Sequence, residues 1–519
     1  MNVLIVFPFS IIAWNNKYEE PRIPLNITYL ASAARKAGHH VNLLDLRVEQ
    51  QKRGLDMPDS LECNDVTLLT KCMEDKIVEN SIEVVGINCL YSGLFPAVVH
   101  LAKRIKALNS NIKVTIGGIH PTIYSREILN QYKEIIDYVI IGEGESSFVE
   151  LLNCLSANEY SRMDNIDGLG YVKDDRVVVN RKNNYIEDLD ELPFPAVDLL
   201  NISDYFTDTS GWHSPKGFPI KTPVPIVTSR SCPNMCNFCS MHFVHGKRIR
   251  YRSPENVIDE MKTYINRYGL NYFNITDDNL TIDRKRVIKL MDLIVKENLN
   301  IQFSTENGVY LNTLDEDVLD AMSRAGLVRL HLAFETGSDY IRTKIIGKHL
   351  YNKKIDELRK ILSKDKYNHI YLYGYFVIGF PEETEETLEE TYQLITSLPL
   401  DNYSVFYATP YPGTRLYDQC LRERLFTEEY FYDADSLVNQ VDVGQMVKGL
   451  PFIKPYNLEQ SKLIDFKKKA LDYLTEKRSN VNVPMSSPLR FDPRQQSPGY
   501  SFKSVSLIDE TLRMEKLYG

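Results

Sequence analysis

The chain has 519 residues, of which 43% are apolar and 25% are charged. That length is too great for one ordinary hydrophobic core, so we expect about two or three globular domains. The formal net charge of −9 argues against a broad surface for nucleic acid. The sequence contains no run of about 18 apolar residues, so we expect no helix that spans a membrane.

The cysteines are unevenly distributed along the chain. Three of the eight fall within residues 232–239, and the other five are scattered. A disulfide framework would spread them differently, so the pattern favours a reducing compartment and one metal site. The apolar N-terminus MNVLIVFPFS has no basic leader and predicts a buried strand rather than a signal peptide. We therefore expect a cytoplasmic protein.

Residues 1–155 alternate between strand-like and helix-like segments. This alternation predicts a doubly wound, Rossmann-like parallel sheet, whose ligands bind beyond the carboxyl ends of the strands. The predicted strands are NVLIVF (2–7), VNLLDL (41–46), VVGINC (84–89), KVTIGG (113–118) and YVIIGEGE (138–145). The loops at their carboxyl ends are 8–16, 89–93, 117–122 and 142–146.

The remaining chain divides into three parts. Residues 156–222 are expected to connect two domains and contain a hairpin pattern, GLGYVKDDRVVV (168–179). Residues 223–430 contain six further strand–helix repeats, which predict a partial (β/α)6 TIM barrel, open or closed. Its strands are PIVTSR (225–230), YFNITDD (272–278), IQFSTEN (301–307), VRLHLAFE (328–335), YLYGYFVIGF (371–380) and NYSVFYATP (402–410). Residues 431–519 are expected to form a mainly helical C-terminal region, with a helix at 457–478 and a polar tail.

The cysteine cluster carries the most chemical information. The segment Cys232-Pro-Asn-Met-Cys236-Asn-Phe-Cys239 follows PIVTSR and so lies at the carboxyl end of a predicted strand. Three thiolates can hold three corners of an iron–sulfur cubane and leave one iron open. A zinc site usually uses four ligands, and His242 or His245 could supply the fourth, so zinc is the alternative.

The C-x3-C-x2-C spacing, with an aromatic residue before the last cysteine, resembles the radical S-adenosylmethionine (radical SAM) superfamily. Five later segments are similar to that superfamily in the same order: TDDN (276–279), FSTEN (303–307), FETGS (334–338), YFVIGFPEET (375–384) and ATPYPGT (408–414). The resemblance implies a [4Fe–4S] cluster on Cys232, Cys236 and Cys239, with S-adenosylmethionine on the open iron. The residues that it implies around S-adenosylmethionine are Phe238, Asp277, Ser304, Glu335 and Ile378.

Three segments resemble the radical SAM subfamily that carries an N-terminal cobalamin-binding domain: IGGIHPT (116–122), IIGEGESSFVELL (140–152) and LPFPAVDLL (192–200). The Asp-x-His-x-x-Gly signature, which supplies a histidine to cobalt in other cobalamin proteins, is absent from the sequence. We therefore expect cobalamin to bind without a histidine on cobalt. The cobalamin contacts implied by the resemblance are Pro8, Cys89, Tyr91, Ser92, Gly117, Gly118, His120, Pro121, Gly142, Glu143 and Gly144.

The resemblance implies a C-methyltransferase. Such an enzyme moves a methyl group from methylcobalamin to an unactivated carbon, or phosphorus, of a small-molecule or natural-product intermediate by means of a 5′-deoxyadenosyl radical. A cyclisation or rearrangement is the first alternative. Methylthio transfer is the second, although the upstream cysteines 63, 72, 89 and 154 do not obviously converge on a second cluster.

The chemistry also needs a low-potential electron, for which we expect an external flavodoxin or ferredoxin. These donors are acidic as a rule, so a local basic patch would receive them. The candidates directly follow the cysteines: Lys247, Arg248, Arg250 and Arg252.

Overall fold

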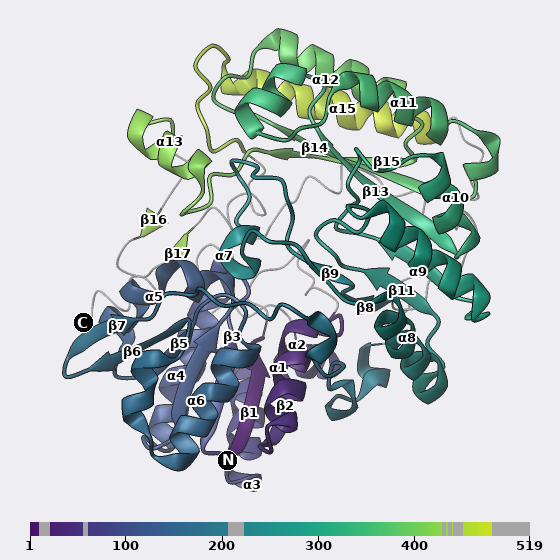
Figure 1. Cartoon of the computed structure of the whole chain (residues 1–519). Helices are drawn as coiled ribbons and strands as arrows, with labels where there is room; N and C mark the ends of the chain where they lie inside the picture. Colours follow the sequence, from purple (N-terminus) through teal and green to yellow (C-terminus); the bar gives the residue numbers. More distant parts are fainter. Residues whose placement is uncertain are drawn as a thin grey trace.

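The computed structural model of the chain describes residues 1–9, 21–55, 61–205, 223–427, 432–433, 438–439 and 450–479. Within them the predicted α/β architecture is confirmed: two parallel sheets lie in separate halves of the molecule, joined through a segment that contains a short helix, α7 (Met241–His245) (Figure 1). Most of loop 8–16, residues 206–222 of the expected connector and the polar tail after residue 479 lie outside the described residues. None of the described helices is long and apolar enough to cross a lipid bilayer.

The first sheet has seven strands in the order β2-β1-β3-β4-β5-β6-β7, and the first five of them run parallel. Its strands are β1 (Asn2–Phe7), β2 (His40–Asp45), β3 (Val84–Asn88), β4 (Lys113–Gly117), β5 (Tyr138–Ile140), β6 (Leu169–Lys173) and β7 (Arg176–Val179). The hairpin that we placed in the connector instead extends this sheet, because β6 pairs antiparallel with β5 and buries Leu169 and Tyr171 in its core.

Helices cover both faces of the first sheet. The strand order reverses at β1, and right-handed crossovers then place helices on opposite faces. Accordingly α1 packs against α6, while α3 packs against α2 and α4. The helices are α1 (Leu25–Lys36), α2 (Leu46–Lys52), α3 (Asn64–Glu79), α4 (Phe95–Leu108), α5 (Ile119–Tyr132) and α6 (Glu145–Ala157).

The second sheet has six parallel strands in the order β15-β14-β13-β12-β11-β8, and β8 and β15 form its two edges. The partial barrel is therefore open. Its strands are β8 (Val224–Ile226), β11 (Tyr272–Ile275), β12 (Gln302–Thr305), β13 (Leu327–Glu335), β14 (Tyr371–Ile378) and β15 (Asn402–Tyr407). Two short strands, β9 (Ser229–Arg230) and β10 (Arg250–Tyr251), pair separately beside it.

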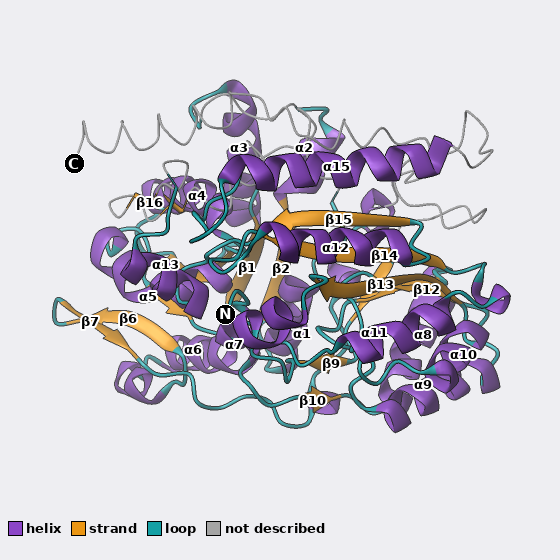
Figure 2. Cartoon of the chain, turned by 90° about the horizontal axis from the view of Figure 1, so that it is seen from above, coloured by secondary structure: helices purple, strands orange, loops and turns teal. Residues whose placement is uncertain are grey.

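Helices cover the outer face of the second sheet. They are α8 (Pro254–Tyr268), α9 (Arg284–Lys296), α10 (Glu316–Arg324), α11 (Asn352–Leu362) and α12 (Glu385–Ser397), and a π-helix (Ile341–Ile346) follows β13. The expected C-terminal helix is α15 (Gln460–Ser479), which packs on α12 and β15 and thus belongs to this outer layer (Figure 2). Helix α13 (Arg415–Glu423) follows β15, and the short strands β16 (Tyr432–Asp433) and β17 (Val438–Asn439) lie beyond it.

Candidate functional site

The three cysteines lie on the loop between β9 and α7, at the carboxyl end of the second sheet. Their thiols are free, and they lie close enough together that charge on one affects the pKa of another. Burial raises the pKa of Cys236 to about 12 and that of Cys239 to about 11. A bound iron centre would offset the cost of these buried thiolates, so the donor set fits the expected [4Fe–4S] cluster.

Asp277 fixes the segment that leads into the cysteine loop. Its buried carboxylate accepts hydrogen bonds from the Thr228 backbone N–H at 2.5 Å, the Thr228 hydroxyl at 2.5 Å and the Ser229 hydroxyl at 2.6 Å. The predicted contact of Asp277 with S-adenosylmethionine stays a prediction. In the structure its carboxylate holds the start of the loop in place.

Two residues next to Asp277 reach the loop itself, and the sequence analysis did not assign them a role. The Asp278 carboxylate accepts a hydrogen bond from the Ser231 backbone N–H at 2.9 Å. The Asn279 amide nitrogen lies 2.7 Å from the Cys232 sulfur and donates to it. The polar TDDN pattern could have indicated that these two residues lie near the cysteines, because the carboxyl ends of neighbouring parallel strands meet at one edge of the sheet.

Glu335 ends β13 in a strained conformation. Its φ is +67°, which is uncommon for a residue with a side chain, and the register of β13 against β14 shifts at this point. The Glu335 carboxylate pairs with Lys348 at 2.7 Å, and Lys348 also donates to the Ala333 carbonyl at 2.6 Å. Burial lowers the pKa of Lys348, but Glu335 and the nearby Cys236 outweigh burial and raise it. A charged pair thus lies beside the cysteines, and sequence reasoning missed its lysine.

The other three residues predicted around S-adenosylmethionine are placed differently from one another. Phe238 packs against the small apolar cluster beneath the cysteine loop, and its ring centre lies 6.0 Å from that of Phe380. Ser304 is fully buried, and its hydroxyl contacts the Asn274 side-chain oxygen at 3.1 Å. The Ile378 side chain lies in the core with the outer helices, so only its backbone is available at the strand end.

At the carboxyl edge of the first sheet, the loops after β3 and β4 lie side by side. The Cys89 backbone N–H donates to the Gly117 carbonyl at 2.7 Å. Gly118 has a φ of +119°, and a Cβ there would lie 2.3 Å from the Cys89 carbonyl oxygen, so only glycine fits. Gly117 itself has room for a Cβ. The Cys89 side chain is fully buried in the core.

His120 and its surroundings lie at the same edge. Its Nδ1 lies 2.9 Å from the Ser92 hydroxyl, and its ring packs between Phe95 and Tyr124 at 4.5 and 4.9 Å between centres. Burial lowers the pKa of His120 to about 3, which keeps the ring neutral. Pro8 and Pro121 are buried here as well, and Tyr91 is half-buried.

Two buried polar atoms at this edge have no hydrogen-bond partner among the described residues. They are the His120 Nε2 and the Asn88 side-chain nitrogen, although Asn26 donates to the Asn88 oxygen at 2.9 Å. A buried polar atom without a partner is costly, so these atoms suit a polar ligand at this edge, as cobalamin would provide. Asn88 was not predicted from the sequence, because it ends a buried strand like any other.

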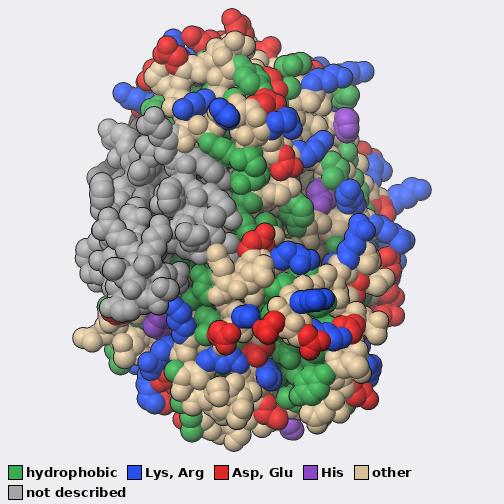
Figure 3. All heavy atoms as spheres, turned by 90° about the vertical axis from the view of Figure 1, so that its left-hand side faces the viewer, with side chains coloured by type: hydrophobic (Ala, Val, Ile, Leu, Met, Phe, Trp, Pro, Cys, Tyr) green, Lys and Arg blue, Asp and Glu red, His purple; other side chains and the backbone are tan. Residues whose placement is uncertain are grey.

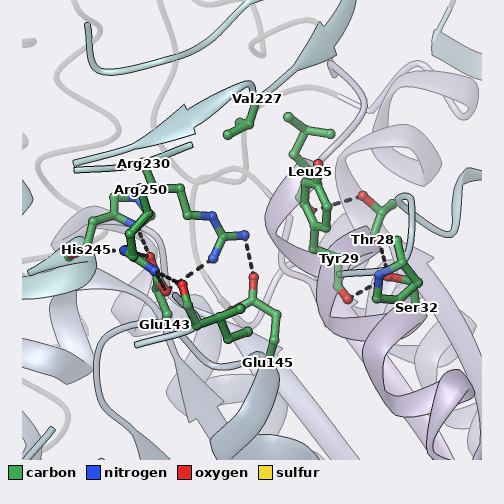
Figure 4. A network of polar contacts seen from close by, with 12 residues as sticks. Leu25, Thr28, Tyr29, Ser32, Glu143, Glu145, Val227, Arg230, His245 and Arg250 are labelled. Carbon is green, nitrogen blue, oxygen red and sulfur yellow. Dashed lines mark hydrogen bonds and ion pairs between the residues drawn. The ribbon is translucent and has the colours of Figure 1, made fainter. Parts of the chain in front are cut away.

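The loop after β5 contacts the segment that carries the cysteines. Both Glu143 oxygens are engaged by Arg250, at 2.6 and 2.8 Å, and by His245 at 2.7 Å (Figure 4). Arg230 lies 3.3 Å from Glu143 and 2.6 Å from Glu145. Burial alone would raise the pKa of Glu143, but these partners hold it well below its usual range. Glu143 therefore joins the first domain to the segment that carries the cysteines.

The glycines that flank Glu143 also lie in tight surroundings. A Cβ on Gly142 would lie 3.2 Å from the Val244 carbonyl oxygen of α7, and one on Gly144 would lie 3.3 Å from Ile140. Gly142 thus lets the loop approach α7 closely. The cobalamin contacts predicted for Gly142, Glu143 and Gly144 stay predictions. In the structure Gly142 and Glu143 contact the segment that carries the cysteines, and Gly144 packs within the first domain.

Only two of the four basic residues predicted to form a patch after the cysteines are exposed. Arg250 is 3% and Arg252 4% exposed, because Arg250 pairs with Glu143 and Arg252 with Glu260 inside the molecule. The expectation that these two arginines receive an electron donor is therefore wrong. Lys247 and Arg248 are exposed, and Arg248 pairs with Glu187 at 2.8 Å on the surface.

The residues needed by the two alternative metal sites are engaged elsewhere. His242 contacts the carbonyls of Asn234 and Gly246, and His245 contacts Glu143, so neither is turned to the cysteines as a zinc ligand. Among the described residues, which include the three cysteines, no group of three or more His, Cys, Asp or Glu side chains is arranged as a site for a metal ion. For a second cluster, Cys89 and Cys154 are core residues of the first domain.

Comparisons with known proteins identify two domains in this chain. The B12 binding domain model matches residues 14–152, and the Radical SAM superfamily model matches residues 226–395. An uncharacterized methyltransferase of Pyrococcus horikoshii is 31% identical over 425 residues, which are 82% of this chain and 84% of the relative. The cytidylyl-2-hydroxyethylphosphonate methyltransferase of Streptomyces wedmorensis is 26% identical over 441 residues, 78% of this chain and 80% of that protein.

Among solved structures, the radical S-adenosylmethionine methyltransferase TsrM from Kitasatospora setae, with cobalamin and a [4Fe–4S] cluster bound, has a similar fold. The TM-score is 0.68 at 16% identity, over 100% of this chain and 99% of that chain. Taken with the matched domains and the relative that is 31% identical, the chain belongs to the cobalamin-binding radical SAM methyltransferase family, whose cofactors are a [4Fe–4S] cluster, S-adenosylmethionine and cobalamin.

Proposed function

We propose that this enzyme transfers a methyl group from methylcobalamin to an unactivated carbon, or phosphorus, of a small-molecule intermediate. The observation that carries the proposal is the contact between the two domains. Loop 142–145, at the carboxyl edge of the first sheet, is bound through Glu143 to Arg250 and His245, which flank the cysteine loop. Two cofactors held at these edges would share one space, as a transfer between them requires.

When bound, S-adenosylmethionine at the open iron supplies the 5′-deoxyadenosyl radical and methylcobalamin supplies the methyl group. The residues of the chain hold and orient these groups. Cys232, Cys236 and Cys239 would hold the cluster, and Asp277 and Asn279 fix their loop. The Glu335–Lys348 pair offers a carboxylate and an ammonium beside the cysteines, which suit the charged amino-acid end of S-adenosylmethionine.

A mass-labelled assay tests the proposal directly. Protein reconstituted anaerobically with iron, sulfide and cobalamin is given S-adenosylmethionine with a trideuterated methyl group, a reductant and a pool of cellular metabolites. We expect a product that gains one trideuteromethyl group, together with 5′-deoxyadenosine. A product without the label would contradict methyl transfer and favour the rearrangement alternative. The Cys236→Ala variant is the control, since it should form neither compound.

We also propose that an external flavodoxin or ferredoxin reduces the cluster and docks near Lys247 and Arg248, in the cytoplasm. Both side chains are exposed close to the cysteine loop, and opposite charges favour encounter. Reversal of both charges to Glu should slow turnover with the protein donor and spare turnover with dithionite. Reversal at the exposed Lys71, on α3, is the matched control. Equal loss with both reductants would contradict docking at this site.

A further inference from the structure

The inner face of the second sheet has a distinct chemical character. On β13, Leu330, Leu332 and Phe334 lie in the core with the outer helices, so the alternate residues Arg329 and His331 face the opposite side. Strand β14 follows the same alternation, and its register places Tyr371 beside Arg329 and Tyr373 beside His331. The face that no outer helix covers is therefore lined by one arginine, one histidine and the tyrosines 371, 373 and 375.

Arg329 is the unusual member of this face. It is 3% exposed, and its guanidinium lies 5.6 Å from the Tyr371 ring centre and 5.3 Å from that of Tyr373. Its Nε is buried without a hydrogen-bond partner, and no carboxylate among the described residues forms an ion pair with it. Burial of a charge without a counter-ion is costly, and two tyrosine faces offset only part of that cost.

One acidic side chain in the same neighbourhood, Glu306, is already paired. Glu306 pairs with Arg22 and accepts a hydrogen bond from the Asn274 amide at 3.0 Å. Burial raises the pKa of Tyr375, and Arg329, Glu306 and Arg22 all act on it, which places these charges in one neighbourhood. Among the described residues, the carboxylate of Glu306 is thus paired with Arg22, and no ion pair joins it to Arg329.

The position of Arg329 constrains the shape of a ligand. Six residues further along β13, Glu335 lies beside Lys348 and the cysteines, about 20 Å away at the rise of an extended strand. Near the Glu335 end of this face, Phe406 of β15 pairs in register with Val377, which follows the β14 partner of Glu335. Phe406 is 43% exposed, with its ring 6.2 Å from that of Tyr375. An exposed phenylalanine at this end offers an apolar surface to a ligand that extends from Arg329. Figure 3 shows one face of the molecule, on which apolar side chains lie among charged ones.

We propose that this inner face binds an elongated small molecule whose anionic group, a carboxylate or a phosphate, pairs with Arg329 and whose apolar body lies against Tyr375 and Phe406. As a statement about the methyl acceptor, this rests on the proposed function; as a statement about anion binding, it does not. Arg329 would act as a determinant of substrate specificity, since a neutral analogue would leave its charge without a partner.

Equilibrium binding to the reconstituted holoenzyme tests the proposal with three probes: 4-phenylbutyrate, 4-phenylbutyl phosphate and the neutral 4-phenylbutyramide. Because a hydrogen bond to a charged group contributes strongly, we expect at least one anion to bind about tenfold more tightly than the amide. The two anions together show whether carboxylate or phosphate is preferred. Arg329→Gln should remove the preference, and Arg329→Lys should retain part of it. The exposed Arg324→Gln, on α10, is the matched control and should behave as the wild type.

Equal affinity of wild-type enzyme for acids and amide, or no binding of either anion, would overturn the proposal without the need for any variant. A preference that survives Arg329→Gln would overturn the assignment to this residue. The assay is independent of turnover. Enzyme that binds anions selectively but forms no labelled product would contradict the proposed function alone, and labelled product without anion selectivity would contradict this inference alone.

Discussion

The two parallel sheets of this protein differ in where they can place functional groups. On β1 of the first sheet, Val3, Leu4, Ile5 and Val6 are all buried in one core, because helices cover both faces. On β13 of the second sheet, apolar residues alternate with Arg329, His331 and Glu335, because helices cover only the outer face. The first sheet can therefore carry ligand contacts only at its strand ends, whereas the second can also carry them along its inner face.

The largest effect should come from the cysteine loop, which lies at the end of the second sheet. Cys236→Ala removes one of the three proposed cluster ligands and should abolish S-adenosylmethionine cleavage. The fold should be retained, since Asp277 and Asn279, rather than the Cys236 thiol, hold the loop. Iron content, circular dichroism and 5′-deoxyadenosine formation provide the measurements. Full cleavage by this variant would show that the cluster lies elsewhere.

The next effect concerns the contact that makes the two regions one unit. Glu143→Gln removes the acid that pairs with buried Arg250, and loss of one partner from a buried pair costs about 3–5 kcal/mol. The urea concentration at the midpoint of unfolding should therefore fall markedly. Glu187→Gln, which removes the exposed partner of Arg248, is the control and should cost less than about 1 kcal/mol. A similar small shift in both variants would mean that the domains are held by other contacts.

A glycine substitution tests whether the strand ends of the first sheet are as closely packed as described. In Gly118→Ala the new Cβ would lie 2.3 Å from the Cys89 carbonyl oxygen in a backbone with φ of +119°. Strain and displacement together should cost about 2–4 kcal/mol and weaken cobalamin binding, which a spectroscopic titration measures. Gly38 has a φ of +90° but open space around it, so Gly38→Ala measures the cost of backbone strain without a collision of the new Cβ. Equal costs in the two variants would exclude the collision.

Acidification should affect the first domain through its buried histidine. Burial lowers the pKa of His120 to about 3, from 6.5 for an exposed ring. Between these values the unfolded chain binds the proton and the folded chain does not, so stability falls as the pH falls from about 6.5. The slope for one group is at most about 1.4 kcal/mol per pH unit. Thermal unfolding of His120→Gln across this range should show a shallower dependence than the wild type; an unchanged slope would contradict the burial of a neutral ring.

The smallest expected effect is that of Cys420→Ala. Cys420 is fully buried in the apolar cluster on which Cys236 and Phe238 pack, but no described thiol pairs with it. The lost sulfur should cost about 1 kcal/mol through a small cavity and leave S-adenosylmethionine cleavage nearly unchanged. Loss of the cluster in this variant would reveal that the packing beneath the loop also positions it.

The sequence by itself determined the elements and the cluster. Strands such as NVLIVF and VRLHLAFE were predictable because a buried strand needs either a continuous run of apolar residues or apolar residues at alternate positions. The three cysteines could be singled out as candidate ligands because they lie together on one short loop. Residues at strand ends, such as Asp277 and Gly118, could be singled out because parallel strands bring their carboxyl ends to one edge.

Only the tertiary structure decided which charges meet. Glu143 was expected to contact a cofactor, and Arg250 and Arg252 were expected on the surface, yet Glu143 and Arg250 lie 107 positions apart and pair inside the molecule. Lys348 was not singled out because nothing local distinguishes it from any other lysine. Likewise, the hairpin 168–179 joined a sheet rather than a linker because an exposed edge strand was there to pair with it. Such long-range pairings depend on chain topology, and local sequence does not encode them.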